Sequence, residues 1–291
     1  SRPTSSPLSA PPAPSPERRI VATAVFLHAH PDDESISTAG VMIAAAEAGP
    51  RVVLVTATDG ALGESAPGTV PDGSTLAEVR GDEVRAAAEI LGVHRVELFG
   101  YRDSGMEGED TNDHPHAFWQ VDVDQAARRL AALLDEEDAD LLTVYDEWGN
   151  YGHPDNIQVH RVGVRAAQLA RVGAVFEATM NRDAMRSLAD DAAFEGVGDQ
   201  DTLEEQRREI AETELGSPAE TITHAVDVTA VLDRKRAAMA AHASQITADS
   251  FFMQLPDHAF AAAFGTEWFI HRGAQRAGEP YALDLFAVLD H

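Results

Sequence analysis

The chain has 291 residues, enough to bury a sizeable hydrophobic core in one large domain or two small ones. Its apolar runs stay below the roughly 18 residues that a membrane-spanning helix needs, which excludes a transmembrane protein. With 49 acidic against 22 basic residues, the formal charge is −27, and such a surface repels nucleic-acid phosphates and anionic lipids. We therefore expect neither nucleic acid nor a membrane as a partner.

Cysteine is absent from the sequence, which excludes disulfides, thiolate zinc sites, iron–sulfur clusters and a cysteine nucleophile. Any metal ion must then be held by His, Asp, Glu or weaker oxygen ligands. Residues 1–19 are rich in Pro, Ser and Ala and carry no hydrophobic periodicity, so we expect a disordered tail. This tail lacks the apolar core of a signal peptide, so the expected location is cytoplasmic.

From residue 20 onward, short apolar runs alternate with helical patterns. The runs are typical of strands buried on both faces, and they lie at 20–28, 51–58, 96–100, 140–146 and 174–180. Helices are expected between them, at 34–48, 74–91 (capped by Ser74), 121–137 and 154–171. This alternation predicts an α/β fold with a Rossmann-like, mostly parallel sheet and helices on both faces.

The chain divides into a core at 20–182, which carries the motifs below, and a portion at 183–291 that completes the same domain. Residues 183–216 are acidic and have a helical pattern, which a solvated insertion explains; a lid or a subunit contact is the functional alternative. A strand at 221–228 and a helix at 230–244 are expected beyond it. We therefore predict a smaller C-terminal α+β portion.

Polar and titratable residues follow four of the predicted strands. In an open parallel sheet, ligands bind beyond the carboxyl ends of the strands, where loops lead into helices. The segments at these ends are 28–34, 58–60, 101–105 and 145–156. Because all four reach the same edge of the sheet, we expect the candidate active site there.

The first of these segments has the pattern of a metal site. His30 and Asp33 are three residues apart across a strand-to-helix turn, so both can converge on Zn²⁺ or a similar cation. Asp32 cannot easily point the same way, which leaves it available as a general base for a metal-activated water. The alternative is an acidic helix start, because Asp stabilises the first turn of a helix without any metal.

A second His-Pro-Asp, at 153–155, begins another predicted helix. A histidine there can donate to a developing oxyanion, and Asp155 can keep His153 protonated and oriented. The alternative is a helix-capping Asp beside an incidental surface histidine. The two motifs together favour a metal-dependent hydrolase.

The pair His-Pro-Asp-Asp-Glu (30–34) and Gly-His-Pro-Asp (152–155) resembles the LmbE-like (PIG-L) family of metal-dependent N-acetylglucosaminyl deacetylases, and within it the mycothiol branch. Similar features continue at 80–83, 102–106, 145–146 and 241–246, with good coverage from 20 to about 180. The resemblance implies hydrolysis of an N-acetyl amide on a small amino-sugar conjugate, which releases a free amine.

The resemblance also implies a role for each matching residue. His30 and Asp33 match metal ligands, and Asp32 matches the general base. His153 matches the group that stabilises the oxyanion and protonates the leaving amine, with Asp155 as its orienting partner. The positions that correspond to substrate-binding residues are Glu34, Arg80, Asp103 and Tyr151.

One position departs from the family pattern, in which His-Pro-Asp-His supplies the third zinc ligand; here the last residue is Asn156. An amide oxygen is a poorer zinc ligand than imidazole, so Zn²⁺ is expected with other divalent cations left open. His160 is a second candidate for completing the site, although a supporting or surface histidine is the simpler interpretation.

Further alternatives stay open at this point. A metal-poor homologue could bind a glycoconjugate without hydrolysis, and a natural-product tailoring deacetylase fits the same motifs. The sequence leaves the oligomeric state open, a homo-oligomer included. His242, in the segment 241–246, could approach the site in the folded protein or be a packed helical histidine.

Overall fold

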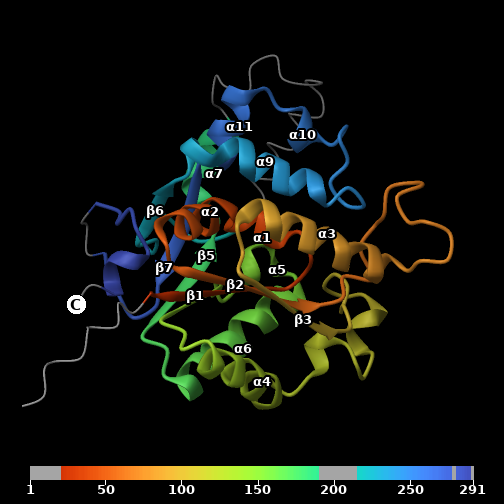
Figure 1. The fold of residues 1–291 in the computed structure, drawn as a ribbon, viewed down its shortest axis with the longest axis horizontal. Helices are drawn as coiled ribbons and strands as arrows, with labels where there is room; N and C mark the ends of the chain where they lie inside the picture. Colours follow the sequence, from red (N-terminus) through yellow and green to blue (C-terminus); the bar gives the residue numbers. More distant parts are fainter. Residues whose placement is uncertain (1–20, 190–214, 277–279, 290–291) are drawn as a thin grey trace, which may run out of the picture.

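Figure 1 shows the computed structural model, which describes residues 21–189, 215–276 and 280–289. The described residues form a seven-stranded sheet in the order β3-β2-β1-β4-β5-β7-β6. Its strands are β1 (Thr23–His28), β2 (Arg51–Thr58), β3 (Arg95–Tyr101), β4 (Leu141–Tyr145), β5 (Ala174–Thr179), β6 (His224–Asp227) and β7 (Thr266–His271). Strands β1 to β5 are parallel, whereas β7 is antiparallel to both β5 and β6. The predicted mostly parallel α/β fold is confirmed.

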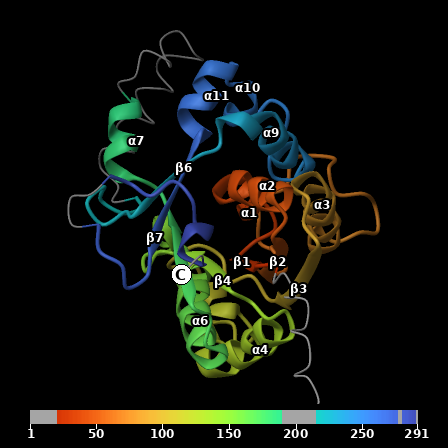
Figure 2. The ribbon, with the colours of Figure 1, turned by 60° about the vertical axis from the view of Figure 1, so that its left-hand side comes forward.

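Helices cover both faces of this sheet, with α2, α3 and α9 on one side and α4 and α6 on the other (Figures 1 and 2). The α-helices are α1 (Asp33–Ser37), α2 (Ala39–Ala48), α3 (Leu76–Leu91), α4 (Val123–Glu136), α5 (Gly149–Gly152), α6 (Pro154–Ala170), α7 (Arg182–Ala189), α9 (Leu232–Ala241), α10 (Phe251–Gln254) and α11 (Asp257–Phe264). Short 3₁₀ turns lie at Asp110–Asp113, Phe118–Gln120, Thr229–Val231 and Phe286–Leu289. None of the helices in the described part of the chain is long and apolar enough to cross a bilayer.

Burial on both faces of the sheet explains why the central residues of β1, 24–27, are all apolar. Val25 and Leu27 pack into the cluster beneath α4 and α6, while Ala24 and Phe26 pack into the cluster beneath α2 and α3. Successive side chains of a strand point to opposite faces, so a strand covered on both faces needs apolar residues at every position. The predicted strand begins three residues later than expected, at Thr23.

The predicted helix at 34–48 is interrupted at Thr38. This residue leaves the helical conformation (φ −139°), and its Oγ1 lies 2.8 Å from Nε2 of the buried His28. A second helix, α2, then begins at Ala39, and its first amides donate to a carboxylate from β7. That carboxylate, Glu267, also accepts from Lys235 of α9, at 2.7 Å. The C-terminal portion therefore fixes the helix that follows the first motif.

Two further expectations are corrected by the structure. The cap of α3 is Thr75 and not Ser74: the Thr75 hydroxyl accepts from the Glu78 amide, and the Glu78 carboxylate accepts from the Thr75 amide. Strand β7 was not expected, and it joins the C-terminal portion to the parallel sheet through β5. Most of the acidic segment 183–216 and the tail 1–19 lie outside the described residues, and α7 accounts for the start of that segment.

The strand order places a topological switch between β1 and β4. Strand β1 continues outward to β2 and β3, whereas its other neighbour, β4, continues to β5 in the opposite direction. In folds of this kind, ligands bind between the connections that leave the two strands at such a switch. Both sequence motifs lie in the connections that lead from β1 to α1 and from β4 to α6, and in the first turns of those helices.

Candidate active site

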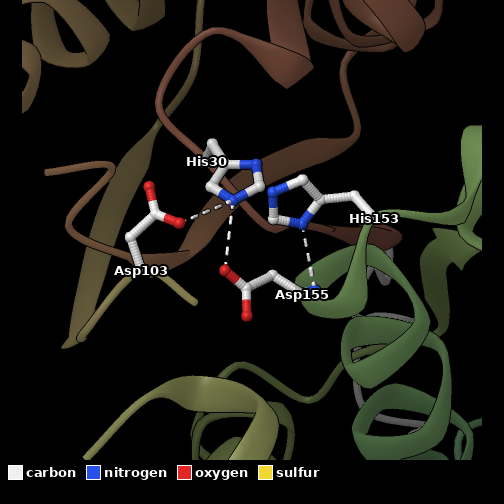
Figure 3. A group of neighbouring side chains, drawn as sticks. All are labelled: His30, Asp103, His153 and Asp155. Carbon is white, nitrogen blue, oxygen red and sulfur yellow. Dashed lines mark hydrogen bonds and ion pairs between the residues drawn. The ribbon is translucent and has the colours of Figure 1, made fainter. Parts of the chain in front are cut away.

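Four buried side chains meet at the switch point: His30 after β1, Asp103 after β3, and His153 and Asp155 at the start of α6 (Figure 3). One potential ligand atom from each lies within 4.8 Å of the others. The two His-Pro-Asp motifs, 123 residues apart in sequence, are thus brought into contact by the sheet. Within the described residues this is a group with the composition and spacing to hold a metal ion.

His30 is the centre of the group. Its Nε2 lies 3.2 Å from Asp155 Oδ2 and 3.7 Å from Asp103 Oδ1, and its Nδ1 lies 3.4 Å from Asp33 Oδ2. Burial lowers the pKa of His30, but these carboxylates outweigh burial and raise it well above the usual value. A concentration of negative charge in the interior is the environment that a bound cation also requires.

Asp33 remains next to His30. Its Oδ2 accepts a hydrogen bond from the His30 backbone amide, at 2.8 Å. Burial acts to raise the pKa of Asp33, but the contacts with His30 outweigh it and hold the pKa below its ordinary range. The carboxylate is therefore ionised at neutral pH, as a metal ligand must be.

Asp32 faces a different partner from its neighbour. Its Oδ2 lies 3.1 Å from Arg80 Nη2. Its backbone φ is 129°, a value that residues other than glycine rarely adopt. Burial is the main cause that raises the pKa of Asp32, to about 7, although Arg80 opposes it. Its side chain makes no capping hydrogen bond to α1, so the acidic helix start considered above does not account for this residue.

His153 is held by the backbone of its own motif. Its Nδ1 accepts from the Asp155 amide, at 3.1 Å, so in the neutral ring the proton is on Nε2. Burial and the nearby His30 lower the pKa of His153. The two imidazoles are edge-to-face, with ring centroids 4.5 Å apart.

The carboxylate of Asp155 does not bind His153, because both of its oxygens are used elsewhere. Its Oδ2 accepts from the Ser104 amide at 2.9 Å and faces His30, and its Oδ1 accepts from the Ser104 hydroxyl. Asp155 thus orients His153 through its backbone amide, whereas we expected its side chain to do so. Ser104 itself was not singled out from the sequence, although its place between Asp103 and Gly105 at a strand end is a usable signal.

The four predicted substrate-binding residues differ in accessibility. Tyr151 is exposed, with its ring centroid 6.1 Å from that of His153, and Asp103 belongs to the buried group. Arg80 is buried and donates to the Pro31 and Gly60 carbonyls, at 2.6 and 2.7 Å. Glu34 is fully buried behind Asp32, where it binds the His242 ring. In this structure, Arg80 and Glu34 are therefore buried residues that bind the backbone of the first motif.

Asn156 has a side-chain oxygen that could bind a metal ion. The residue is 1% exposed, its Nδ2 donates to the Gly149 carbonyl at 3.3 Å, and its Oδ1 has no hydrogen bond of normal geometry among the described residues. A buried polar atom without a partner is costly, and a cation would satisfy it. Imidazole nitrogens, carboxylate oxygens and an amide oxygen together are ligands that suit a divalent ion. His160 lies apart from this group, with Nδ1 at 2.9 Å from the Tyr145 carbonyl oxygen.

Comparison with known proteins identifies relatives of this chain. Residues 25–167 match the model of the PIG-L family, described as GlcNAc-PI de-N-acetylase. The 1D-myo-inositol 2-acetamido-2-deoxy-alpha-D-glucopyranoside deacetylase of Acidothermus cellulolyticus is 42% identical over 294 residues, a match that covers 93% of this chain and 96% of that protein.

Solved structures share the fold at lower sequence identity. The A40926 pseudoaglycone deacetylase Dbv21 superposes with a TM-score of 0.58 at 16% identity, covering 86% of this chain and 97% of that one. GalB, the 4-carboxy-2-hydroxymuconate hydratase of Pseudomonas putida KT2440, superposes with a TM-score of 0.55 at 18% identity, covering 90% and 100%. One fold therefore supports both a deacetylase and a hydratase, so function has to be argued from the site.

Proposed function

The chain belongs to the PIG-L family, and on that premise we propose that it hydrolyses the N-acetyl amide of an N-acetylglucosamine conjugate to acetate and a free amine. The observation that carries this proposal is the meeting of the two His-Pro-Asp motifs in one buried group. A base, a proton donor and a set of metal-ligand atoms at one edge of the sheet are the parts that amide hydrolysis needs.

The substrate we propose is 1D-myo-inositol 2-acetamido-2-deoxy-alpha-D-glucopyranoside, which the relative from Acidothermus cellulolyticus is named for. The match spans nearly the whole length of both chains, so it includes the segments that surround the site. The net charge of −27 suits an uncharged glycoside better than an anionic ligand.

Asp32 is proposed to take the proton from the attacking water. Its pKa of about 7 lies close to neutral pH, where a general base combines a large ionised fraction with sufficient basicity. Its carboxylate is paired with Arg80, whereas that of Asp33 is paired with His30, so Asp32 need not compete with Asp33 for a cation.

His153 is proposed to serve the other half of the reaction. With Nδ1 engaged by the Asp155 amide, the N–H at Nε2 can donate a hydrogen bond to the oxygen on which negative charge develops, while the proton stays on the ring. The Tyr151 hydroxyl can supply a second hydrogen bond, because a phenol keeps its proton at neutral pH. The proton that Asp32 removes must finally reach the leaving nitrogen, and a route through His153 is the expected one.

His30, Asp33 and Asn156 are proposed to hold a divalent cation, Zn²⁺ in the first instance, with Asp103 and Asp155 close by. The chemistry that such an ion supplies when bound is to lower the pKa of a nearby water and to polarise the amide carbonyl. We further propose that Asp103 and Tyr151 contact the sugar or inositol hydroxyls, and that Arg80 and Glu34 support the loop that does so.

Replacing Asp32 tests this proposal directly. In Asp32→Asn, kcat for acetate release from the proposed substrate should fall at least about 100-fold, because general-base catalysis is lost while the side-chain volume is kept. Asp82→Asn is the matched control, since the Asp82 side chain on α3 is 88% exposed and outside the site. Acetate release at the rate of the unchanged protein in Asp32→Asn would eliminate Asp32 as the base.

A further inference from the structure

A buried histidine from the C-terminal portion lies directly behind the first motif. His242 follows the last residue of α9 and is fully buried. Its Nε2 is 2.6 Å from Oε1 of Glu34, which is 208 residues away in sequence and also fully buried. A buried carboxylate lowers stability unless it is paired and hydrogen-bonded, and the His242 ring is that partner for Glu34.

The segment that carries His242 is anchored to the same side of the site. The Ser244 amide and hydroxyl both donate to the Glu83 carboxylate of α3, each at 2.7 Å. The Ser244 carbonyl accepts from the Ala66 amide, at 3.0 Å, in the loop between β2 and α3. His242 is therefore held in place independently of its contact with Glu34.

Glu34 connects His242 to Asp32. Its Oε2 accepts a hydrogen bond from the Asp32 backbone amide, at 3.0 Å, while its Oε1 accepts from the Ser35 hydroxyl and binds His242. The Asp32 amide belongs to the residue whose φ is 129° and ψ −29°. A conformation of this kind costs about 1–3 kcal/mol and persists only where surrounding contacts enforce it.

Asp32 is thus held at two points. Glu34 holds its backbone amide, and Arg80 binds both its carboxylate and the Pro31 carbonyl in front of it. Removing the first contact would let the peptide rotate toward an ordinary φ, and the Cβ would change direction with it. The distance from the carboxylate to any reacting group would then change even though Arg80 remains.

We propose that His242 is a positioning residue for Asp32, acting through Glu34 to enforce the backbone conformation that aims the Asp32 carboxylate at the substrate. This inference rests on the proposed function of Asp32 as the base. His242 does not contact the reacting atoms; it acts through two hydrogen bonds in series.

The inference is tested with His242→Leu and His242→Gln. Leucine fills the space without a donor, whereas the Gln side-chain amide can place an N–H near the position of Nε2. In His242→Leu, kcat should fall by on the order of 10- to 100-fold with KM nearly unchanged, since small misplacements of a reacting group have effects of this size. His242→Gln should recover most of that loss. His258→Leu, at an exposed position on α11, is the control.

Two further measurements separate positioning from general destabilisation. Amide hydrogen exchange at Asp32 should accelerate in His242→Leu and return toward the original rate in His242→Gln, at equal thermal stability. In the Asp32→Asn background, His242→Leu should reduce the residual rate little, because the base that it positions is already absent.

The outcomes distinguish this inference from the proposed function. If Asp32→Asn retains full activity, the base assignment is wrong and the inference falls with it. If Asp32→Asn is inactive but His242→Leu has normal kcat and normal exchange at Asp32, only the role of His242 is refuted. Equal losses of activity in the Leu and Gln variants would also refute it.

Discussion

At the scale of single residues, Asn156 is the position that sets this chain apart from the pattern its family resemblance implies. Its Oδ1 is buried and has no hydrogen bond of normal geometry among the described residues, so it is available as a ligand atom. A neutral amide oxygen nevertheless binds zinc more weakly than an imidazole nitrogen does. On the proposal that Asn156 is a ligand, we expect this residue to influence which ion the site holds and how tightly.

Asn156→His should raise the affinity for Zn²⁺ by on the order of 10-fold or more, because even residues that only orient a metal ligand change affinity by that factor. Competition with a zinc chelator measures this without reference to activity. Gln168→His, on an exposed position of the same helix, controls for the added imidazole. Equal zinc affinities in the original protein and in Asn156→His would show that Asn156 is not a ligand.

The residues of the site divide into those that sequence can predict and those that need the fold. His30, Asp32 and Asp33 are adjacent, so their local spacing carries the information. The contact of His30 with Asp103 requires the parallel pairing of β1, β2 and β3, and the contact of Glu34 with His242 requires the packing of α9 on α1. No local pattern encodes a pairing over 208 residues.

At the scale of elements, the break between α1 and α2 is a tertiary effect. The apolar pattern of 34–48 is continuous and predicts one helix, but Thr38 binds His28 and Glu267 caps the amides of Gly40 and Val41. Local propensity is overridden by these contacts. Strand β7, which carries Glu267, was missed because it lies in a C-terminal stretch with no strand-helix alternation.

The contribution of the capping box at the start of α3 to the stability of the protein can be tested by substitution. Thr75→Ala should lower the free energy of unfolding by about 1 kcal/mol, because it removes one half of the capping box with Glu78. Ser74→Ala should have a much smaller effect, since Ser74 is one residue outside the cap. Urea denaturation of both variants provides the measurement. A larger loss for Ser74→Ala would mean that Ser74 is the cap after all.

At the scale of the whole molecule, strands β1, β2 and β4 could be predicted because nearly all of their residues are buried and most of them are apolar. Strand β3 is only partly buried and includes two charged residues, so its prediction depended on its place in the strand-helix alternation. The strand order could not be predicted, since many orders satisfy the same pattern. The switch between β1 and β4 follows from that order, and with it the meeting of the two motifs. The sequence therefore predicts which residues take part in the chemistry, but not how they are arranged in space.

The net charge of −27 makes the stability of the folded protein depend on salt. Compact acidic chains repel themselves, and NaCl from about 0.01 M to about 1 M shortens the Debye length from about 30 Å to about 3 Å. We expect the midpoint of thermal unfolding to rise over this range. Potassium chloride should have the same effect if screening is the cause. A constant or falling midpoint would mean that favourable ion pairs dominate.

The ion pair between Lys235 and Glu267 has a practical consequence for the study of this protein. Lys235 is the sole lysine of the sequence, and it is 1% exposed. Amine-directed acylating reagents can therefore reach its side chain only when α9 separates from the sheet. The fraction of molecules acylated at Lys235, measured by mass spectrometry over time, therefore gives the rate at which this part of the fold opens.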